Sequence, residues 1–301
     1  MKKLCALLAA LIFCLPAMAA AETAVASFYP IYIFALNLTQ GIDGIDVEML
    51  AQPDTGCLHD YQLQTGDMKA LANAGVFLIN GAGMEGYLPM VTEAFPALPV
   101  VDASAGIALL CGDADDEHGH DHDHDHDHAA NAHIWLDVDN AIIMVTNMCE
   151  GMAQVWPQHR TALEANRDAF IGRLIVLDAR LTDMLAPVAG KPIITFHEAF
   201  PYFANAYGVE IAAVVSREPG DALSPAQLGR LVVTVRELGT PPLFIEPQYD
   251  DMAARTLAGE TGAAVYVLDP VVTGPEGDAA LTYYEDMMIR NGEVLVEALA
   301  E

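Results

Sequence analysis

The sequence predicts an α/β fold of two lobes, each a parallel sheet flanked by helices, with one long rigid helix joining them. Short apolar runs alternate with helical stretches on both sides of residues 157–186, and this alternation is typical of parallel sheets. We therefore expect an N-terminal lobe at 22–155, a linking helix at 156–187 and a C-terminal lobe at 188–301. In this architecture a ligand cleft is expected between the lobes, at the carboxyl ends of the strands.

Residues 1–21 have the composition of a secretory signal peptide. Two lysines precede the apolar run 4–15, and small residues end the stretch, as cleavage requires. The run is too short to anchor the protein across a bilayer. The large Phe13 before Cys14 does not match the small residue that lipid attachment requires. We therefore expect export to the periplasm or the extracellular space, with the signal peptide cleaved and no lipid anchor.

The N-terminal lobe is predicted from apolar runs of strand length that alternate with amphipathic stretches. The expected strands are 24–28, 47–50, 76–80 and 100–102. The expected helices are 30–38, 66–73, 85–95 and 137–156. The last of these carries its apolar side chains on one side, at Ile142, Val145, Met148, Met152 and Val155.

The linking helix is predicted from apolar residues that recur at helical spacing, namely Leu163, Phe170, Leu174, Leu177, Leu181 and Leu185. Pro157 suits a first helical turn, and Pro187 follows the expected end. At 1.5 Å per residue the helix would extend about 45 Å, which is enough to reach from one lobe to the other. The alternative is a helix packed inside a single domain.

The C-terminal lobe repeats the alternation. Its expected strands are 192–196, 211–215, 242–245 and 264–268. Its expected helices are 198–207, 225–238, 250–259 and 282–300, and Ser224 is a suitable N-cap for the second of them.

The charge and the cysteines limit the possible partners. The chain has 42 acidic and 13 basic residues, a formal net charge of −29, which excludes nucleic acid and anionic membranes as partners and is compatible with binding of cations. Cleavage of the signal peptide would leave Cys57, Cys111 and Cys149. In an oxidising compartment we expect one disulfide and one buried thiol, with Cys57–Cys111 the favoured pair and the pairing itself left open.

A segment rich in histidine and aspartate, 113–130, divides the N-terminal lobe. Its histidines alternate with acidic residues or glycine and are His118, His120, His122, His124, His126 and His128. Such a polar run has no apolar area to bury, so we expect a mobile loop. Imidazole and carboxylate groups bind divalent transition metals, so the loop should be an auxiliary metal site of low affinity. The alternatives are a solubilising insert or an affinity tag.

Three histidines outside this loop occupy positions where a cleft ligand should lie. His59 follows the expected strand 47–50 through a turn, His197 ends the expected strand 192–196, and His133 closes the histidine-rich loop. Asp269 ends the expected strand 264–268 and supplies a carboxylate. Three imidazoles and one carboxylate form a four-coordinate set that Zn2+ accepts. A fourth histidine, His159, is expected on the surface, in the first turn of the linking helix.

Five motifs agree with this set: GCLHDYQLQTGDMKAL, NAHIWLD, ITFHEAFPYFANAYGVE, LFIEPQYD and YVLDPVVTG. From about residue 24 to the C-terminus the chain resembles the zinc/manganese-type substrate-binding proteins of bacterial metal ABC transporters. The resemblance implies two lobes bridged by a rigid helix, with a divalent metal ion held between them. Carried over by motif, its ligands are His59, His133, His197 and Asp269. Leu58 and Ala132 stand where the family often has proline.

The resemblance also bears on the metal and the partners. It implies delivery to a membrane permease by a monomer that does not close by a large hinge motion. Manganese-type members are expected to have Glu where this chain has His197, and nitrogen-rich coordination favours Zn2+ over Mn2+. Partners that orient the imidazoles are expected, and Asp60, Glu198 and Glu246 are candidates by position.

Other classes of protein remain as alternatives. A manganese- or iron-binding member of the family, and a metal buffer or adhesin without a transporter, fit the same motifs. A zinc hydrolase would also use three histidines. However, Pro201 occupies the place of the second histidine in an H-E-x-x-H motif that starts at His197. We therefore expect no enzymatic activity.

Overall fold

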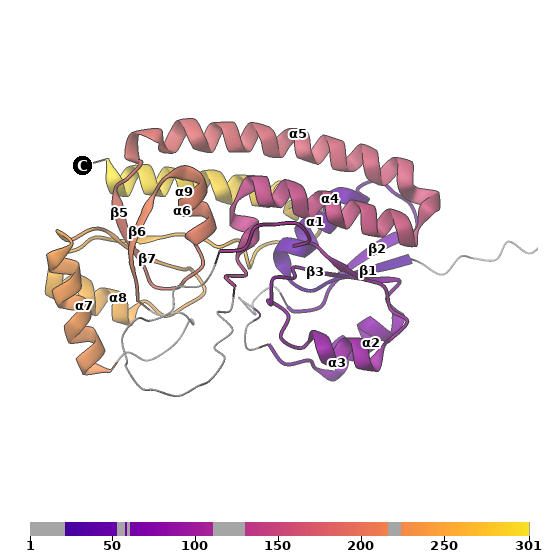
Figure 1. Cartoon of the computed structure of the whole chain (residues 1–301), viewed down its shortest axis with the longest axis horizontal. Coiled ribbons are helices and arrows are strands. Elements are labelled where there is room, and N and C mark those ends of the chain that lie inside the picture. Colours follow the sequence, from indigo (N-terminus) through magenta and orange to yellow (C-terminus); the bar gives the residue numbers. More distant parts are fainter. Residues whose placement is uncertain (1–21, 53–57, 59–60, 111–129, 216–223, 301) are drawn as a thin grey trace, which may run out of the picture.

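The computed structural model describes residues 22–52, 58, 61–110, 130–215 and 224–300. These residues form two four-stranded parallel sheets, which lie side by side in Figure 1. The first sheet has the order β2-β1-β3-β4, and the second has the order β6-β5-β7-β8. The strands are β1 Glu22–Ala26, β2 Ile45–Met49, β3 Val76–Ile79, β4 Val100–Asp102, β5 Pro192–Thr195, β6 Glu210–Val214, β7 Leu243–Ile245 and β8 Val265–Val267.

Helices cover both sheets. They are α1 Tyr29–Thr39, α2 Thr65–Asn73, α3 Leu88–Ala94, α4 Val138–Val155, α5 Arg160–Leu185, α6 Pro201–Tyr207, α7 Pro225–Glu237, α8 Met252–Thr261 and α9 Tyr283–Leu299. The predicted α/β fold of two sheets and a long connecting helix is confirmed. Every expected strand and helix is present, with its ends displaced by a few residues at most.

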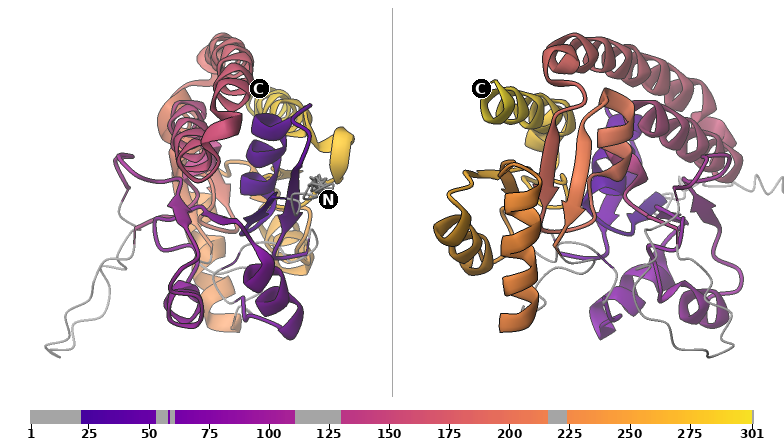
Figure 2. Two further views of the ribbon diagram at one scale, coloured as in Figure 1. Left: turned by 90° about the vertical axis from the view of Figure 1, so that its right-hand side faces the viewer. Right: turned by 60° about the vertical axis from the view of Figure 1, so that its left-hand side comes forward.

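The long helix α5 runs along one side of the molecule over both sheets (Figure 1), and the turned view on the right of Figure 2 shows the same span. Short 3-10 turns, Pro157–His159 and Ala186–Val188, extend it at each end. Its 26 residues correspond to about 39 Å. The side chains predicted to face the protein, from Leu163 to Leu185, are buried.

One hydrophobic core runs under both sheets. It includes Phe77 of the first sheet, Leu174 of α5, Leu295 of α9 and Ile193 of the second sheet. A separate small cluster under α7 and α8 contains Ile194, Val235, Leu243, Leu257 and Ala263. Because the main core crosses the expected lobe boundaries at 156 and 187, the division of the chain into domains at these positions stays a prediction.

Two short helices, α3 and α6, begin three residues later than expected, and both have a proline in the first turn. The helix expected from residue 85 begins at Leu88, because the Glu85 carboxylate turns back to accept hydrogen bonds from the backbone N–H groups of Asn80 and Gly81. The helix expected from Glu198 begins at Pro201. The residue before a proline disfavours helical geometry, so residues 198–200 form a turn instead.

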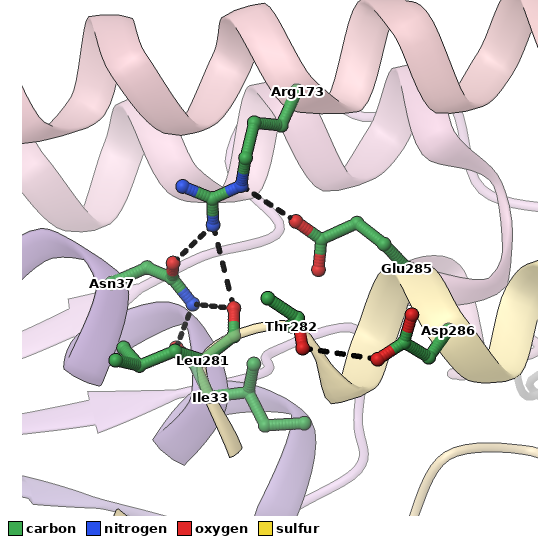
Figure 3. Close-up of polar contacts among 7 residues, drawn as sticks. All are labelled: Ile33, Asn37, Arg173, Leu281, Thr282, Glu285 and Asp286. Atoms are coloured by element: carbon green, nitrogen blue, oxygen red, sulfur yellow. Dashed lines mark hydrogen bonds and ion pairs between the residues drawn. The ribbon is translucent and has the colours of Figure 1, made fainter. Parts of the chain in front are cut away.

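A polar cluster joins three helices on the α5 side of the molecule (Figure 3). Arg173 of α5 donates to Glu285 of α9 at 2.8 Å and also to the side chain of Asn37 of α1. The Asn37 amide nitrogen donates to the carbonyl oxygens of Ile33 at 3.0 Å and Leu281 at 3.1 Å. The first and last helices are therefore fixed to the linking helix.

Candidate metal centre

Three neighbouring strands of the second sheet supply acidic and imidazole groups at their carboxyl ends. His197 lies two residues after β5, Glu246 directly follows β7, and Asp269 lies two residues after β8. Since β5, β7 and β8 are adjacent in the sheet and run parallel, their ends meet at one edge. All three side chains are buried, each with less than a tenth of its surface exposed.

The His197 ring is oriented by a carboxylate. Its Nδ1 lies 2.7 Å from Oε1 of Glu246, whose other oxygen accepts a hydrogen bond from Gln248 at 2.6 Å. An ionised carboxylate only accepts, so Nδ1 carries the proton and Nε2 presents its lone pair. That Nε2 atom is buried and has no hydrogen-bond partner among the described residues. This arrangement is the one in which a protein histidine binds a metal ion.

His133 is oriented by an amide. Its backbone N–H donates to the Asn131 side-chain oxygen at 2.9 Å, and its Nδ1 lies 3.1 Å from the same oxygen. The Asn131 amide nitrogen donates to the carbonyl oxygen of Glu198, next to His197, at 2.8 Å. Asn131 therefore connects the segment that carries His133 to the segment that carries His197.

The two rings lie against each other across the junction of the two halves of the chain. The centroids of the His133 and His197 rings are 4.9 Å apart, with an interplanar angle of 79°. The Trp135 ring packs against His133, with the two ring centroids 5.2 Å apart. Its indole N–H donates to the carbonyl oxygen of Pro270 at 2.7 Å, which fixes the Trp135 ring in place. The fold thus brings together two of the three predicted imidazole ligands.

Asp269 belongs to a tightly shaped loop. Its Oδ1 accepts a hydrogen bond from the backbone N–H of Val271 at 2.7 Å, and its backbone N–H and carbonyl both bond the Asn291 side chain. Val271 has a φ of +61°, which is rare for a β-branched residue and costs energy. Burial raises the pKa of Asp269, and the nearby charge of Glu246 raises it further. A cation at this site would relieve that repulsion.

Most of the other residues predicted to bind or support a metal lie outside the described part of the chain. His59, Asp60, the six loop histidines, Cys57 and Cys111 lie outside the described residues, as does the predicted signal peptide. Among the residues that the structure describes, no group of three His, Cys, Asp or Glu side chains has metal-binding geometry. The four-ligand set therefore stays a prediction, with His133 and His197 adjacent and Asp269 at the same edge.

Three other residues from the sequence analysis lie among the described residues. Leu58, directly before His59, is fully buried in the core. Cys149 is a buried free thiol, as one of the three cysteines was expected to be. The Nε2 atom of His159 lies 2.9 Å from a carboxylate oxygen of Glu22, at the junction of α4 and α5. In the ranges described, no helix combines the length and apolar composition needed to cross a membrane.

The sequence interpretation named Glu246 as a partner but missed Asn131. Of the three candidates by position, Glu246 contacts His197, and Glu198 offers its backbone carbonyl oxygen to Asn131. The only sequence signal for Asn131 is its place two residues before His133. An asparagine side chain reaches the backbone two residues further along the chain in this way.

Comparison with known proteins agrees with this geometry. Residues 24–298 match the model of the family described as zinc-uptake complex component A, periplasmic. The high-affinity zinc uptake system protein ZnuA of Bacillus subtilis is 30% identical over 280 residues, covering 91% of this chain and 86% of that protein. The zinc-binding protein AdcA of Streptococcus pyogenes serotype M3 is 28% identical over 285 residues, covering 90% of this chain.

The chain spans 55% of the length of AdcA. Among solved structures, the crystal structure of ZnuA superimposes with a TM-score of 0.77 at 25% identity, covering 93% of this chain and 99% of the other. The two sheets and the long helix are therefore shared with a solved protein over nearly its whole length.

Proposed function

The chain belongs to the periplasmic zinc-uptake complex component A family, and from this premise we propose that it is a solute-binding protein that captures Zn2+ outside the cytoplasm. It delivers the ion to the membrane permease of an ABC transporter. It binds and releases its cargo without chemical change and is not an enzyme.

The observation that carries the proposal is the contact between His133 and His197. Two buried imidazoles lie with their ring centroids 4.9 Å apart, and the Nδ1 of each lies beside an oxygen that accepts a hydrogen bond. The buried Nε2 of His197 has no hydrogen-bond partner among the described residues, and leaving a buried polar atom unsatisfied costs free energy. A metal ion bound at Nε2 satisfies that atom.

The proposed ligands are His133, His197 and Asp269, with His59 as the fourth. Imidazole nitrogen binds Zn2+ at neutral pH without help from a thiolate. Mn2+ prefers oxygen ligands, and a site with three nitrogens ranks it below Zn2+. Cu2+ and Ni2+ would bind such a site at least as tightly, so selection of zinc depends in part on which metals are available.

Capture and release follow from the surrounding structure. The negatively charged protein attracts cations, and the histidine-rich segment 113–130, which precedes His133 in the sequence, collects them at low affinity. Because α5 and the shared core hold the two sheets together, release on the permease occurs by local movement of the segments that carry the ligands. The protein acts as a monomer, exported by its signal peptide.

The experiment is a zinc competition titration of the mature protein and four single variants. His59→Ala, His133→Ala and His197→Ala each remove a ligand and should weaken binding by more than the ~10- to 100-fold loss typical of residues that only support ligands. His159→Ala, which lies at the start of α5, is the matched control and should bind as the parent does. If all four variants retain the parent affinity, the proposed site is wrong.

Transport is tested separately. A strain that lacks the protein should grow poorly when zinc is chelated and recover with the parent gene but not with the His197→Ala gene. Normal growth of the deletion strain on trace zinc would contradict a role in uptake.

A further inference from the structure

The segment before His133 is held from the other side by a residue of the first sheet. Asn80 directly follows β3 and is completely buried. Its side-chain nitrogen donates to the carbonyl oxygen of Ala132 at 3.0 Å and to that of Gly81 at 3.0 Å. Ala132 is the residue directly before His133, so this hydrogen bond joins the edge of the first sheet to the backbone of the proposed ligand.

Asn80 is itself held by a buried carboxylate. Glu85 accepts hydrogen bonds from the backbone N–H of Asn80 at 2.7 Å and from that of Gly81 at 3.1 Å. The turn that follows has three successive residues with positive φ, at +77° for Gly81, +52° for Ala82 and +85° for Gly83. Such a backbone needs restraint, because alanine rarely adopts this conformation. The Glu85 carboxylate provides the restraint at the start of the turn.

We propose that Asn80 is a positioning residue for His133 and that Glu85 holds Asn80 in place. The inference rests on the proposed function, in which His133 is a metal ligand. Asn131 ties the segment 131–133 to the second sheet through Glu198, and Asn80 ties it to the first sheet through Ala132. The two amides hold the backbone between the sheets, where the His133 ring meets His197.

The position of the His133 backbone should affect zinc affinity, because zinc coordination requires defined distances between the ion and its ligands. Zinc–nitrogen distances tolerate deviations of only about 0.2 Å. A ligand on a backbone that shifts by more than this must reorganise before it binds. Removal of the Asn80 side chain should therefore lower zinc affinity, although Asn80 does not touch the ion.

Asn37 provides a matched control for Asn80. It is also buried, with 3% of its surface exposed, and its side-chain nitrogen likewise donates to two carbonyl oxygens (Figure 3). It lies on the α5 side of the molecule, and its two hydrogen-bond acceptors, Ile33 and Leu281, are not proposed metal ligands. Asn80→Ala and Asn37→Ala thus each remove two hydrogen bonds to carbonyl oxygens, and Asn37→Ala also removes the one from Arg173. Only Asn80→Ala should affect zinc.

The experiment compares Asn80→Ala, Asn37→Ala, Glu85→Gln and the double variant of residues 80 and 85. Zinc affinity is measured by competition at about pH 8, which is above the raised pKa of Glu85, about 7. Urea unfolding of the metal-free proteins and the visible spectrum of bound Co2+ are measured in parallel. We expect Asn80→Ala to bind zinc about tenfold more weakly, at the lower end of the range for supporting residues, with an altered Co2+ spectrum.

The other variants should behave differently. Asn37→Ala should lose stability but keep the parent affinity and spectrum. Glu85→Gln leaves one acceptor oxygen for the two backbone N–H groups of Asn80 and Gly81. It should therefore bind zinc several-fold more weakly and alter the Co2+ spectrum in the same way as Asn80→Ala, which a role in stability alone would not produce. The double variant should bind no more weakly than Asn80→Ala alone, because the two residues act in one chain of contacts.

The outcomes separate this inference from the proposed function. Parent-like affinity in Asn80→Ala, together with weak binding by His133→Ala, would overturn the positioning role and leave the metal site intact. Parent-like affinity in His133→Ala would overturn the site itself. If Asn80→Ala does not fold, Glu85→Gln decides the question, because parent-like affinity and spectrum in that variant would overturn the inference.

Discussion

The burial of the Glu85 carboxyl group should make the free energy of unfolding depend on pH. Burial raises the pKa of Glu85 to about 7 from a usual value of 4.5, although hydrogen bonds from the backbone N–H groups of Asn80 and Gly81 act in the opposite direction. Since the pKa is higher in the folded state than in the unfolded chain, the folded state binds more protons between these values. Stability contributed by this group is therefore present at low pH and is lost as the pH rises through about 7.

The increase in the pKa of Glu85 from 4.5 to about 7 corresponds to a free energy of about 3 kcal/mol. Glutamine has nearly the same shape and never ionises, so Glu85→Gln should gain stability over the parent as the pH increases. Between about pH 4.5 and pH 8, the difference in free energy of unfolding between the variant and the parent should grow by about 3 kcal/mol in favour of the variant. The assay is urea denaturation of the metal-free proteins at several pH values.

The comparison with the parent cancels the titration of the ten histidines, which both proteins share. Glu93→Gln, at an exposed position on the neighbouring helix α3, is the matched control and should show no such growth. A difference between Glu85→Gln and the parent that stays constant over this pH range would refute the reasoning. It would mean that Glu85 ionises in the folded protein as it does in the unfolded chain.

Three further predictions concern the site and the turn beside it. Glu246→Gln should weaken zinc binding by about 10- to 100-fold in a competition titration, because a neutral amide raises the basicity of the His197 ring less than a carboxylate does; an unchanged affinity would contradict the role of the Glu246 carboxylate. Deletion of residues 113–128 should lower the number of zinc ions bound per chain, counted by elemental analysis, while the tightest ion is retained; loss of that ion would make the loop a primary source of ligands. Gly81→Ala should destabilise the protein by about 1–3 kcal/mol in urea unfolding, because the new methyl group would lie 1.9 Å from the Asp102 carboxylate oxygen and displace it; Gly83→Ala, at a similar φ of +85° but with open space around it, should cost only about 1 kcal/mol.

Much of the fold could be predicted because it depends on local patterns. Buried strands such as Val76–Ile79 are short apolar runs, and α5 is set by leucines at helical spacing. Histidines at strand ends could be identified for the same reason, since a parallel sheet presents those ends together. The position of His197 could therefore be assigned a function before the structure was known.

The contacts that orient the ligands could not be predicted from the sequence. Glu246 lies 49 residues from His197, and Asn80 lies 52 residues from Ala132, so only the folded chain brings each pair together. The role of Asn131 could not be predicted, because asparagine is common in loops, where its side chain bonds the nearby backbone. The predicted start of α3 at residue 85 is wrong, because the Glu85 side chain accepts hydrogen bonds from backbone N–H groups earlier in the chain and the helix begins only at Leu88.

The packing of the last helix against the first has a consequence for the order in which the protein can fold. The ring of Phe34 in α1 lies 5.3 Å from that of Tyr284 in α9, and Asn37 bonds the carbonyl oxygen of Leu281. The first sheet thus gains one wall of its core from residues synthesised about 250 positions later, and contacts of such long range slow folding. A nascent chain that ends before α9 leaves the apolar face of α1 in contact with water. The first sheet therefore completes its core only when α9 packs against α1, and we expect the metal site to assemble after that step.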